Sequence, residues 1–483
     1  MIEGVSRRGI ISGLGALVVV GFDPRSQGWI TTANAAANFD AVPPLSGSLF
    51  LDAAHREAAA DDFGHLVHAT PTAVLLPGAS TDVVKMLRFC RRHRIPVAMR
   101  GQGHAQFGQC QAQAGVVIDT SSLATIHSLT EKNGACVDAG VRWSDLVVAA
   151  AEQGLTPPVL TDYLELSVGG TVSVGGIGGT MQHFGVQGDN VLELEVVTGE
   201  GELVTCSPHE RPELFDAVTS GLGQCALILR ATLRLVPAPT QALVFQLFYD
   251  DIDLFVRDQL RLVHDQRFEY LEGQVVSTES GGWRYMIEAA SLYTPPCIPN
   301  EARLLHDSRD DVTLRQRSQT SYLDFAFRLA PTIEFLKSIG VWGFPHPWLS
   351  LFLPASRAAG YVGNVLTTLT TADTGQGPIL FYPVLKHRVR RPFFRLPSEP
   401  VSFAFNILRT SPPDPAVQAA MVASNRALYE AAVAVGGTRY ASGAIPMTSA
   451  DWRQHFGTVW RDFERAKRRF DPNNILTPGA GIF

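Results

Sequence analysis

The spacing of apolar and polar residues predicts alternating strands and helices in the first half of the chain. Residues 73–76 form a short apolar run typical of a buried strand, and residues 83–92 carry apolar side chains at helical spacing. Ser80 is a plausible N-cap for that helix, because its hydroxyl can accept a backbone N–H. Further strands are predicted at 96–99 and 115–119, a helix at 143–152, and a hairpin at 190–206.

The second half begins where Pro237, Ala238 and Pro239 interrupt the pattern, and we place a domain boundary there. Apolar runs broken by Gly and Pro turns, most clearly over 349–413, then predict an antiparallel sheet with a few helices. A strand is predicted at 243–248 and helices at 255–265, 417–435 and 460–470.

The first twenty residues have the composition of an export signal. Arg7 and Arg8 precede an apolar run from Ile10 to Val20, and these eleven residues are too few to span a bilayer, which needs about 20. The paired arginines point to the twin-arginine route and to a periplasmic or extracellular protein without a membrane span. A short buried helix is the alternative. An Ala-x-Ala site lies at 33–35, and residues 21–37 would be a spacer or a retained arm.

Composition indicates a folded globular protein of a few domains. The chain has 483 residues, 46% of them hydrophobic, and 40 Lys+Arg against 46 Asp+Glu give a net charge of −6. No nucleic-acid partner is expected, because this balance lacks a basic footprint. The six Cys show no CxxC spacing, which argues against a zinc ribbon, and no metal site is predicted.

Two glycine-rich segments carry most of the chemical signal. The first, residues 100–108, has Gln106 where the third glycine of GxGxxG belongs, so a Rossmann site is not supported. The second, residues 169–179, holds six glycines in eleven positions and is predicted to lie flat against a ligand. Closely spaced glycines can turn backbone N–H groups toward a diphosphate, although a set of tight turns has the same pattern.

His104 lies between glycines of the first segment. A histidine there is more often a loop hydrogen-bonder than a reactive group. Its neutral ring nitrogen is nevertheless a competent nucleophile toward an activated cofactor carbon near pH 7. His183 and His346 are interpreted as core residues.

Several segments together resemble the cytokinin dehydrogenases, a family of FAD-linked oxidases of the vanillyl-alcohol oxidase type. They are RGQGH at 100–104 with Gln109, TDYL at 161–164, VGGT at 168–171, NVLELEVVTG at 190–199, GLGQ at 221–224, YLEG at 270–273, PHPWL at 345–349, HFG at 455–457 and LTPG at 476–479. The match covers nearly all of residues 45–483 in the family's order, and it is far more specific than any single motif.

The resemblance implies an α+β oxidoreductase with a small-molecule substrate. Its PCMH-type FAD-binding domain would have two parts, 38–240 and 440–483, and residues 241–439 would form a substrate cap with an antiparallel sheet and flanking helices. Residues 1–37 would be the signal and spacer. FAD is implied to be covalent through His104, with a single bond because no Cys lies between 137 and 205. O2 or a quinone would accept the electrons.

The resemblance also assigns roles to individual residues. Asp162 matches the acid that hydrogen-bonds the substrate amine, and Glu272 matches its partner in the cap, so these two are the predicted catalytic residues. Tyr440 falls where a tyrosine lines the flavin, and Thr477 stands where the family commonly has Ser. The predicted cofactor-binding residues are Arg100, Gly101, Gln102, Gly103, His104, Ala105, Gln109, Thr161, Asp162, Tyr163, Ser167, Gly169, Gly170, Ser173, Gly175, Gly176, Gly179, Ile228, Tyr440 and Thr477.

Four positions depart from the family's pattern. Leu160 and Val389 stand where the family has Trp, Ala105 where it has Ser, and Ala480 where it has Gln. We therefore expect less aromatic stacking surface near the substrate and the flavin, and weaker or broader turnover of cytokinins than in a typical member.

The implied reaction removes hydride from the carbon next to a secondary amine, most specifically cleaving N6-isoprenoid adenines to adenine and an aldehyde. An ionised Asp162 that accepts the amine N–H would stabilise positive charge developing on nitrogen. Glu272 beside it cannot also be charged cheaply, so the pair is expected to share a proton. The alternatives are a related covalent-flavin oxidase acting on an alcohol, sugar or natural-product intermediate, and an inactive secreted binding protein. Without the resemblance, Asp162 reads as a loop-capping aspartate.

Overall fold

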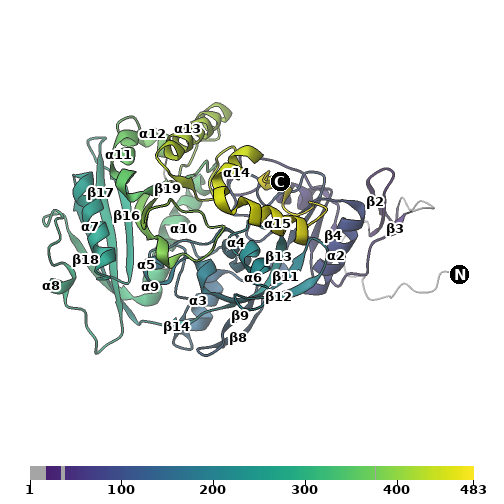
Figure 1. Ribbon diagram of the computed structural model, residues 1–483, viewed down its shortest axis with the longest axis horizontal. Coiled ribbons are helices and arrows are strands. Elements are labelled where there is room, and N and C mark those ends of the chain that lie inside the picture. Colours follow the sequence, from purple (N-terminus) through teal and green to yellow (C-terminus); the bar gives the residue numbers. More distant parts are fainter. Residues whose placement is uncertain (1–17, 34–38, 376) are drawn as a thin grey trace.

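A computed structural model describes residues 18–33, 39–375 and 377–483 (Figure 1). The paired arginines, most of the apolar run and most of the Ala-x-Ala site lie outside these described residues. Within them, no helix is long and apolar enough to cross a membrane. Figure 1 shows two halves side by side, with the large sheet on the left and the N-terminal sheets and C-terminal helices on the right.

Two sheets form the core of the N-terminal half. The order β4-β5-β7-β6 contains parallel neighbours at β5, β7 and β6, whereas the order β12-β11-β13-β9-β8 is antiparallel. The strands are β4 (Ser48–Phe50), β5 (Ala73–Leu76), β6 (Val97–Arg100), β7 (Val116–Asp119), β8 (Ile126–Thr130), β9 (Gly134–Asp138), β11 (Val191–Thr198), β12 (Leu203–Cys206) and β13 (Ala226–Leu233), with a separate pair β10 (Leu155–Thr156) and β14 (Val236–Pro237). The predicted strands and the hairpin of β11 and β12 are confirmed.

The helices of this half are α1 (Ala53–Ala59), α2 (Ser80–His93), α3 (Trp143–Ala151), α4 (Val168–Val174), α5 (Met181–Phe184) and α6 (Pro212–Val218), with 3₁₀ turns η1 (Thr120–Ser122) and η2 (Gln187–Asn190). The prediction that Ser80 caps α2 is wrong, because Ala79 holds the N-cap position and makes no side-chain cap bond. The buried Asp82 carboxylate in the first turn instead accepts the backbone N–H groups of Gly47 and Gly78. The N-terminus of α2 is thus fixed by the contact between Asp82 and the distant Gly47.

An eight-stranded antiparallel sheet forms the other half, in the order β18-β15-β17-β16-β20-β21-β19-β22. Its strands are β15 (Gln241–Tyr249), β16 (Tyr270–Ser277), β17 (Trp283–Tyr293), β18 (Gln316–Ser321), β19 (Leu349–Pro354), β20 (Ile379–Leu385), β21 (Val401–Ile407) and β22 (Thr438–Arg439). The predicted antiparallel sheet is confirmed, and all eight strands fall within 241–439.

The later helices are α7 (Ile252–His264), α8 (Glu301–Leu304), α9 (Tyr322–Ala326), α10 (Ala330–Ser338), α11 (Ala355–Leu366), α12 (Thr371–Thr374), α13 (Pro415–Ala434), α14 (Ser449–Phe456) and α15 (Trp460–Phe470), with 3₁₀ turns η3 (Val341–Gly343), η4 (Lys386–Arg388), η5 (Gly457–Val459) and η6 (Pro478–Ala480). Successive residues of a strand point to opposite faces of its sheet. On β20, Phe381 therefore packs in the core cluster that includes α7 and α11, while Tyr382 packs with Met181 of α5. One face of the sheet is covered by its own helices, and the other meets the N-terminal half.

The chain returns to the N-terminal half after β22, and Figure 1 shows α14 and α15 in yellow over that half. Leu476 forms a parallel bridge to Val97 of β6, and the Thr477 N–H donates to the Val97 carbonyl at 2.8 Å. Trp452 and Phe463 share an apolar cluster with Ala217 of α6. The C-terminal segment therefore packs on the N-terminal half, as expected for an FAD-binding domain built from two parts of the chain. The exact domain boundaries stay predictions.

An N-terminal hairpin packs against α2. It consists of β1 (Val19–Asp23) and β2 (Gly28–Thr31), with β3 (Asp40–Ala41) beside β1. Phe22 is 2% exposed, and Trp29 stacks on Phe89 with 5.9 Å between ring centroids. The Trp29 indole N–H donates to Thr72 Oγ1 at 2.9 Å. The described part of residues 21–37 is thus packed against the domain, and whether it is a spacer or a retained arm stays a prediction.

Candidate active site

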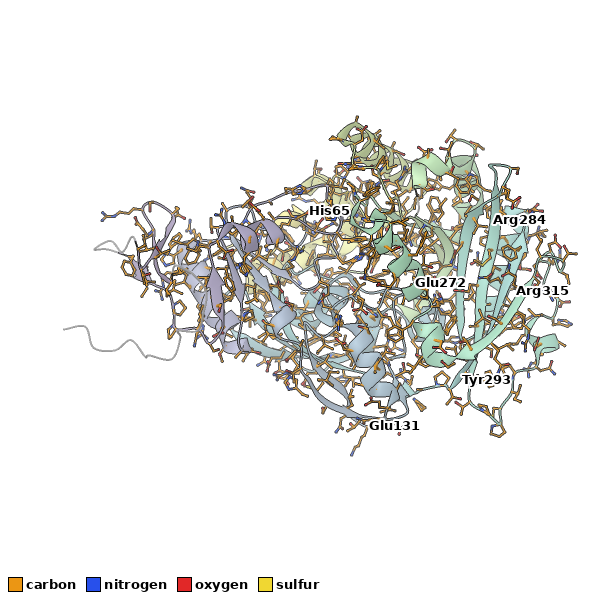
Figure 2. All side chains as sticks on the ribbon, turned by 180° about the vertical axis from the view of Figure 1, so that it is seen from behind. His65, Glu131, Glu272, Arg284, Tyr293 and Arg315 are labelled. Atoms are coloured by element: carbon orange, nitrogen blue, oxygen red, sulfur yellow. The ribbon has the colours of Figure 1, made fainter. Side chains whose placement is uncertain are left out.

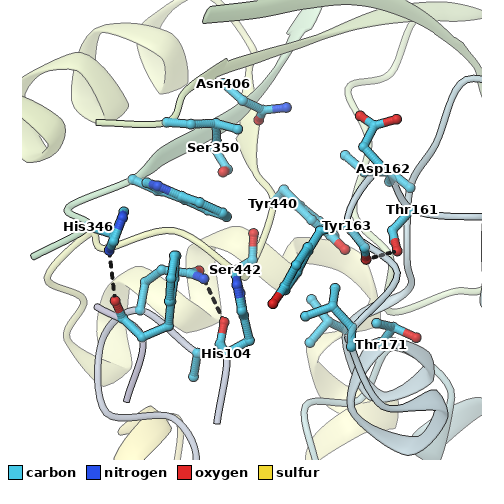
Figure 3. A pocket seen from close by; sticks show the side chains of 18 of the residues that line it. His104, Thr161, Asp162, Tyr163, Thr171, His346, Ser350, Asn406, Tyr440 and Ser442 are labelled. Carbon is cyan, nitrogen blue, oxygen red and sulfur yellow. Dashed lines mark hydrogen bonds between the residues drawn. The ribbon is translucent and has the colours of Figure 1, made fainter. Parts of the chain in front are cut away.

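A cavity of about 960 Å³ lies where the two halves meet, and both halves and the C-terminal return contribute to its wall. In Figure 3 the side chains of His104, Tyr163 and Tyr440 surround the same space. The predicted site residues that line the cavity are Gly101, Gln102, Gly103, His104, Ala105, Gln109, Thr161, Asp162, Tyr163, Ser167, Gly169, Gly170, Ser173, Ile228, Tyr440 and Thr477. Segments up to several hundred residues apart in sequence are thus brought to one cavity.

The first glycine-rich segment lies against the N-cap of α4 at the cavity wall. A Cβ on Gly101 would lie 2.0 Å from Oγ of Ser167, the N-cap residue, so a side chain at 101 would require Ser167 to move. The prediction of a flat loop over 169–179 is wrong in its first half, because Val168–Val174 forms the short helix α4. The Val168 and Gly169 N–H groups are taken by the carbonyls of Val141 and Ala139, and this tertiary pairing fixes the first turn.

Four of the predicted cofactor-binding residues, Arg100, Gly175, Gly176 and Gly179, do not line the cavity. A Cβ on Gly175 would meet the Phe394 ring at 2.4 Å, one on Gly176 the Gln187 side chain at 2.0 Å, and one on Gly179 the Tyr270 ring at 2.4 Å. These glycines therefore allow protein to pack on protein. The Arg100 guanidinium lies over Gly103 and donates to the Asp61 carbonyl, away from the cavity.

His104 is held between aromatic rings at the cavity. Its ring stacks on Phe63 with 3.8 Å between centroids and 17° between planes. Burial, and to a lesser extent the nearby His346, lower the pKa of His104 to about 3, so the imidazole is neutral at pH 7. Its buried Nε2 has no hydrogen-bond partner in the described part of the chain. A neutral ring with an unused nitrogen at the cavity is the state that a nucleophile needs.

His346 and Thr477 are two further notable features of the wall. His346 is buried, as expected for a core residue, but it also lines the cavity and stacks on the other face of Phe63 at 3.9 Å. Thr477 has φ of 50°, a left-handed conformation that is costly for a β-branched residue. Its hydroxyl donates to the Gly223 carbonyl at 2.8 Å, which holds it there.

Asp162 lies in the wall beside a cluster of charged and phenolic groups. Arg328, which precedes α10, donates from Nη2 to Asp162 Oδ1 at 2.5 Å and from Nε to Glu288 Oε2 at 3.0 Å. The Tyr270 hydroxyl also donates to Asp162 Oδ1, at 3.2 Å, and the Arg328 guanidinium lies 4.7 Å from the Tyr270 ring centre. Both of these donors meet Oδ1, so they orient the carboxylate from the same side.

Glu272 of β16 does not line the cavity and is buried in the interior, and Figure 2 shows it near the middle of the molecule. Burial, and after it the Asp162 carboxylate, raise the pKa of Glu272 well above its ordinary value. The Glu272 carboxyl is therefore favoured in its protonated form, and the sharing of a proton with Asp162 stays a prediction.

Sequence reasoning missed Arg328, Glu288 and Tyr270 as members of this cluster. Arg328 stands between Phe327 and Leu329 in a run of apolar residues, and a lone cation in such a run is a signal that could have found it. Tyr270 and Glu288 lie on the neighbouring strands β16 and β17, where Tyr270 is paired with Ala290. Their approach to Asp162 depends on how the sheet packs on the N-terminal half.

The expected loss of aromatic surface at positions 160 and 389 does not affect the cavity. Neither Leu160 nor Val389 lines it, because both side chains pack in apolar clusters of the interior. Trp342, Trp348 and Trp283 line the cavity instead. The two substitutions are therefore a poor basis for expecting weaker cytokinin turnover.

The cavity fits a large planar cofactor with a diphosphate arm. Side-chain-free backbone at Gly101, Gly103, Gly169 and Gly170 forms part of the wall, and the buried His104 nitrogen faces no protein partner among the described residues. No group of three or more His, Cys, Asp or Glu in the described ranges could hold a metal ion.

Comparisons with known proteins agree with this geometry. Residues 71–207 match the family model described as "FAD binding domain", and residues 285–483 match "Cytokinin dehydrogenase 1, FAD and cytokinin binding". An "uncharacterized oxidoreductase ORF5 in fasciation locus" of Rhodococcoides fascians is 41% identical over 90% of this chain and 99% of the relative. Cytokinin dehydrogenase 2 of Arabidopsis thaliana is 32% identical over 94% of this chain and 97% of the relative. Cytokinin dehydrogenase 3 of Oryza sativa subsp. japonica is 35% identical, over 88% and 89%.

The similarity spans both halves and nearly the whole of each relative, so it concerns the complete architecture and not one domain. The resemblance seen in the sequence motifs is confirmed, as is the α+β fold with an FAD-binding domain and a cap. This chain is an FAD-dependent oxidoreductase, and it belongs to the cytokinin dehydrogenase family.

Proposed function

We propose that this enzyme oxidises the carbon next to a secondary amine and cleaves N6-isoprenoid adenines to adenine and an aldehyde. The observation that carries this proposal is the Asp162 carboxylate, which faces the cavity and is oriented by Arg328 and Tyr270 through a single oxygen. The same carboxylate is proposed to accept the substrate N–H.

Asp162 acts by holding the substrate nitrogen while charge develops on it. FAD supplies the two-electron oxidant that takes hydride from the adjacent carbon. As that carbon loses hydride, positive charge grows on nitrogen, and a fixed carboxylate within hydrogen-bond distance stabilises it. Water then adds to the resulting C=N bond, and cleavage gives the amine of adenine and an aldehyde.

Glu272 and Arg328 set the surroundings of the Asp162 carboxyl group. Because the pKa of Glu272 is raised, this carboxyl stays protonated and adds no second negative charge beside Asp162. Arg328 supplies a cation whose other side is held by Glu288 at 3.0 Å. Trp342 and Trp348 supply apolar surface in the cavity wall on which a purine can pack.

His104 is proposed to hold FAD covalently. Its ring lines the cavity, it is neutral because its pKa is lowered to about 3, and its position is fixed by stacking on Phe63. Nε2 of His104 has no hydrogen-bond partner in the described ranges, so this nitrogen is available to form the bond to the cofactor.

We test the reaction by anaerobic mixing of holoenzyme with N6-isopentenyladenine and with its N6-methylated derivative, which lacks the N–H. The secondary amine should bleach the flavin absorbance, and the methylated compound should bleach it far more slowly because it offers the Asp162 carboxylate no N–H. Equal bleaching by both compounds, or bleaching only by an alcohol or sugar, would overturn the amine assignment. Repeating the turnover with O2 and with a quinone identifies the electron acceptor.

Export by the twin-arginine route is also proposed, to the periplasm or the cell exterior. That route carries folded proteins, and covalent attachment of FAD at His104 needs a folded cavity first. The hairpin of β1 and β2 supports a specific form of this proposal, because Phe22 and Trp29 are anchored on α2. The part of the chain from Val18 onward then stays with the mature protein.

A further inference from the structure

A second, much smaller cavity lies behind Tyr440, which also lines the large one. Its volume is about 10 Å³, close to the space that one small sphere such as a water molecule needs. Polar side chains reach it from four separate segments: Ser220 after α6, Arg395 between β20 and β21, Arg439 at the end of β22, and His455 on α14. Phenylalanines such as Phe393 and Phe394 close the rest of the wall.

Each of these four side chains brings an unsatisfied buried atom. Ser220 Oγ, Arg395 Nε, Arg439 Nε and His455 Nδ1 have no hydrogen-bond partner in the described residues. Ser220 and Arg439 are 2% exposed and His455 is 8% exposed, so bulk water does not satisfy them. Buried polar atoms without partners are rare in native proteins. Both Arg Nε atoms are donors, and Ser220 Oγ and one tautomer of His455 can donate too, so the four atoms indicate a common acceptor between them.

The charge of the surroundings is positive. No carboxylate of the described chain forms an ion pair with Arg395 or Arg439, although many other arginines have one. The remaining bonds of Arg439 go to the carbonyls of Gly443 and Ile445. Burial lowers the pKa of Arg439 to about 10, which still leaves it charged at pH 7. Burial, and then Arg439 and Arg395, lower the pKa of His455, so this ring is neutral.

We propose that this cavity is a binding site for a small monovalent anion of the size of chloride. A halide can accept hydrogen bonds from all four side chains and balances buried guanidinium charge, whereas a water molecule accepts from only two donors and brings no charge. Sulfate and phosphate are too large for a cavity of about 10 Å³. The anion would tie Ser220, Arg395, Arg439 and His455 together behind Tyr440, and so stiffen one wall of the flavin cavity. This inference does not depend on the proposed reaction.

The test uses the holoenzyme in sodium gluconate, with sodium chloride, sodium bromide or sodium sulfate added at constant ionic strength. Chloride and bromide should raise the Tm by about 2 °C along a saturable curve, because a ligand of the native state stabilises by mass action. Crystals grown with bromide should show an anomalous peak within hydrogen-bond distance of Arg395 Nε and Arg439 Nε. An equal effect of sulfate, or a water at the site in bromide crystals, would overturn the proposal.

Variants connect the salt effect to this cavity. Arg395→Met, which alters the least buried of the four side chains, should abolish the saturable halide response. Arg453→Met removes an exposed arginine of the same helix as His455 and should keep the full response. Ser220→Ala removes one donor and should raise the halide concentration at half-effect. If Arg395→Met responded to halide as the wild type does, the site would lie elsewhere and the proposal would fail.

Discussion

Arg328 Nη2 donates to Asp162 Oδ1 at 2.5 Å, and this contact joins two residues that are 166 positions apart. Asp162 belongs to a loop of the N-terminal half, and Arg328 lies between α9 and α10 on the cap side. The ion pair therefore connects the loop that carries the proposed amine acceptor with the segment between α9 and α10. Glu288 holds the guanidinium from its other side at 3.0 Å.

Arg328→Gln should slow flavin reduction by roughly 10²-fold. Without the guanidinium that bonds both Asp162 and Glu288, the Asp162 carboxylate shifts, and it must be positioned within about 1 Å. FAD content should stay unchanged, because the proposed covalent attachment is at His104 and not at Arg328. Stopped-flow reduction by the best amine substrate measures the rate. Arg142→Gln is the matched control, as Arg142 is an exposed arginine that pairs with Asp145 and Glu165. A normal reduction rate in Arg328→Gln would contradict the positioning role.

Asp162→Asn should slow flavin reduction by roughly 10² to 10⁴, the effect of losing a positioned acid–base group. The amide keeps the shape and one carbonyl acceptor but removes the negative charge. Substrate binding should therefore suffer less than the rate, and separate fits of the two in single-turnover experiments would show it. If this variant reduced its flavin as fast as the wild type, the amine-oxidising assignment would be lost.

Glu272→Gln should flatten the pH dependence of stability. The pKa of Glu272 is raised well above the ordinary 4.5, so the folded protein holds a proton that the unfolded chain releases. The stability linked to this proton is complete below the unfolded pKa and is lost as pH rises through the folded pKa. Glutamine does not titrate, so urea midpoints should fall less steeply with pH above about 5. In activity, the pH optimum should shift more than the maximal rate.

His104→Ala should lose FAD on denaturation. In the wild type, the yellow fluorescence should stay with the polypeptide after acid precipitation, because the bond to His104 survives unfolding. His346→Ala is the control: this ring stacks on the same Phe63 and also lines the cavity, but its Nδ1 is bonded to the Phe63 carbonyl at 3.1 Å. Release of free FAD from the wild type would leave His104 as a loop residue only.

The mature, exported protein should have its first residue at or before Val18, either because cleavage occurs there or because the signal is not cleaved. Cleavage at the Ala-x-Ala site of residues 33–35 would remove the hairpin, whose Phe22 is buried on α2. Intact mass of the secreted protein measures the start, and Arg7→Lys with Arg8→Lys should block export. Phe22→Ala should cost about 3 to 5 kcal/mol of stability in a protein that retains the hairpin. A mature chain starting at Ala36 with unchanged stability would contradict the retained arm.

Many secondary structure elements of this protein could be predicted from local sequence. Strands such as β5 and β7, helices such as α15, and the hairpin of β11 and β12 follow from the spacing of apolar residues, because burial of one face imposes a period of two or about 3.6. The motifs around His104 and Asp162 likewise identified the family, because they occur along the chain in the family's order. Most of the predicted residues line one cavity.

The tertiary structure alone decided which side chains meet. Arg328 reaches Asp162, Glu272 stays out of the cavity wall, and Gly179 makes room for the Tyr270 ring. The apolar run around Arg328 marks it as unusual, but no local pattern says that Asp162 is its partner. Leu160 and Val389 turned out to pack away from the cavity for the same reason. Side-chain proximity depends on strand order and on how the two halves dock, which are properties of distant segments. A period in the sequence tells which face of an element is buried, but not which residue it is buried against.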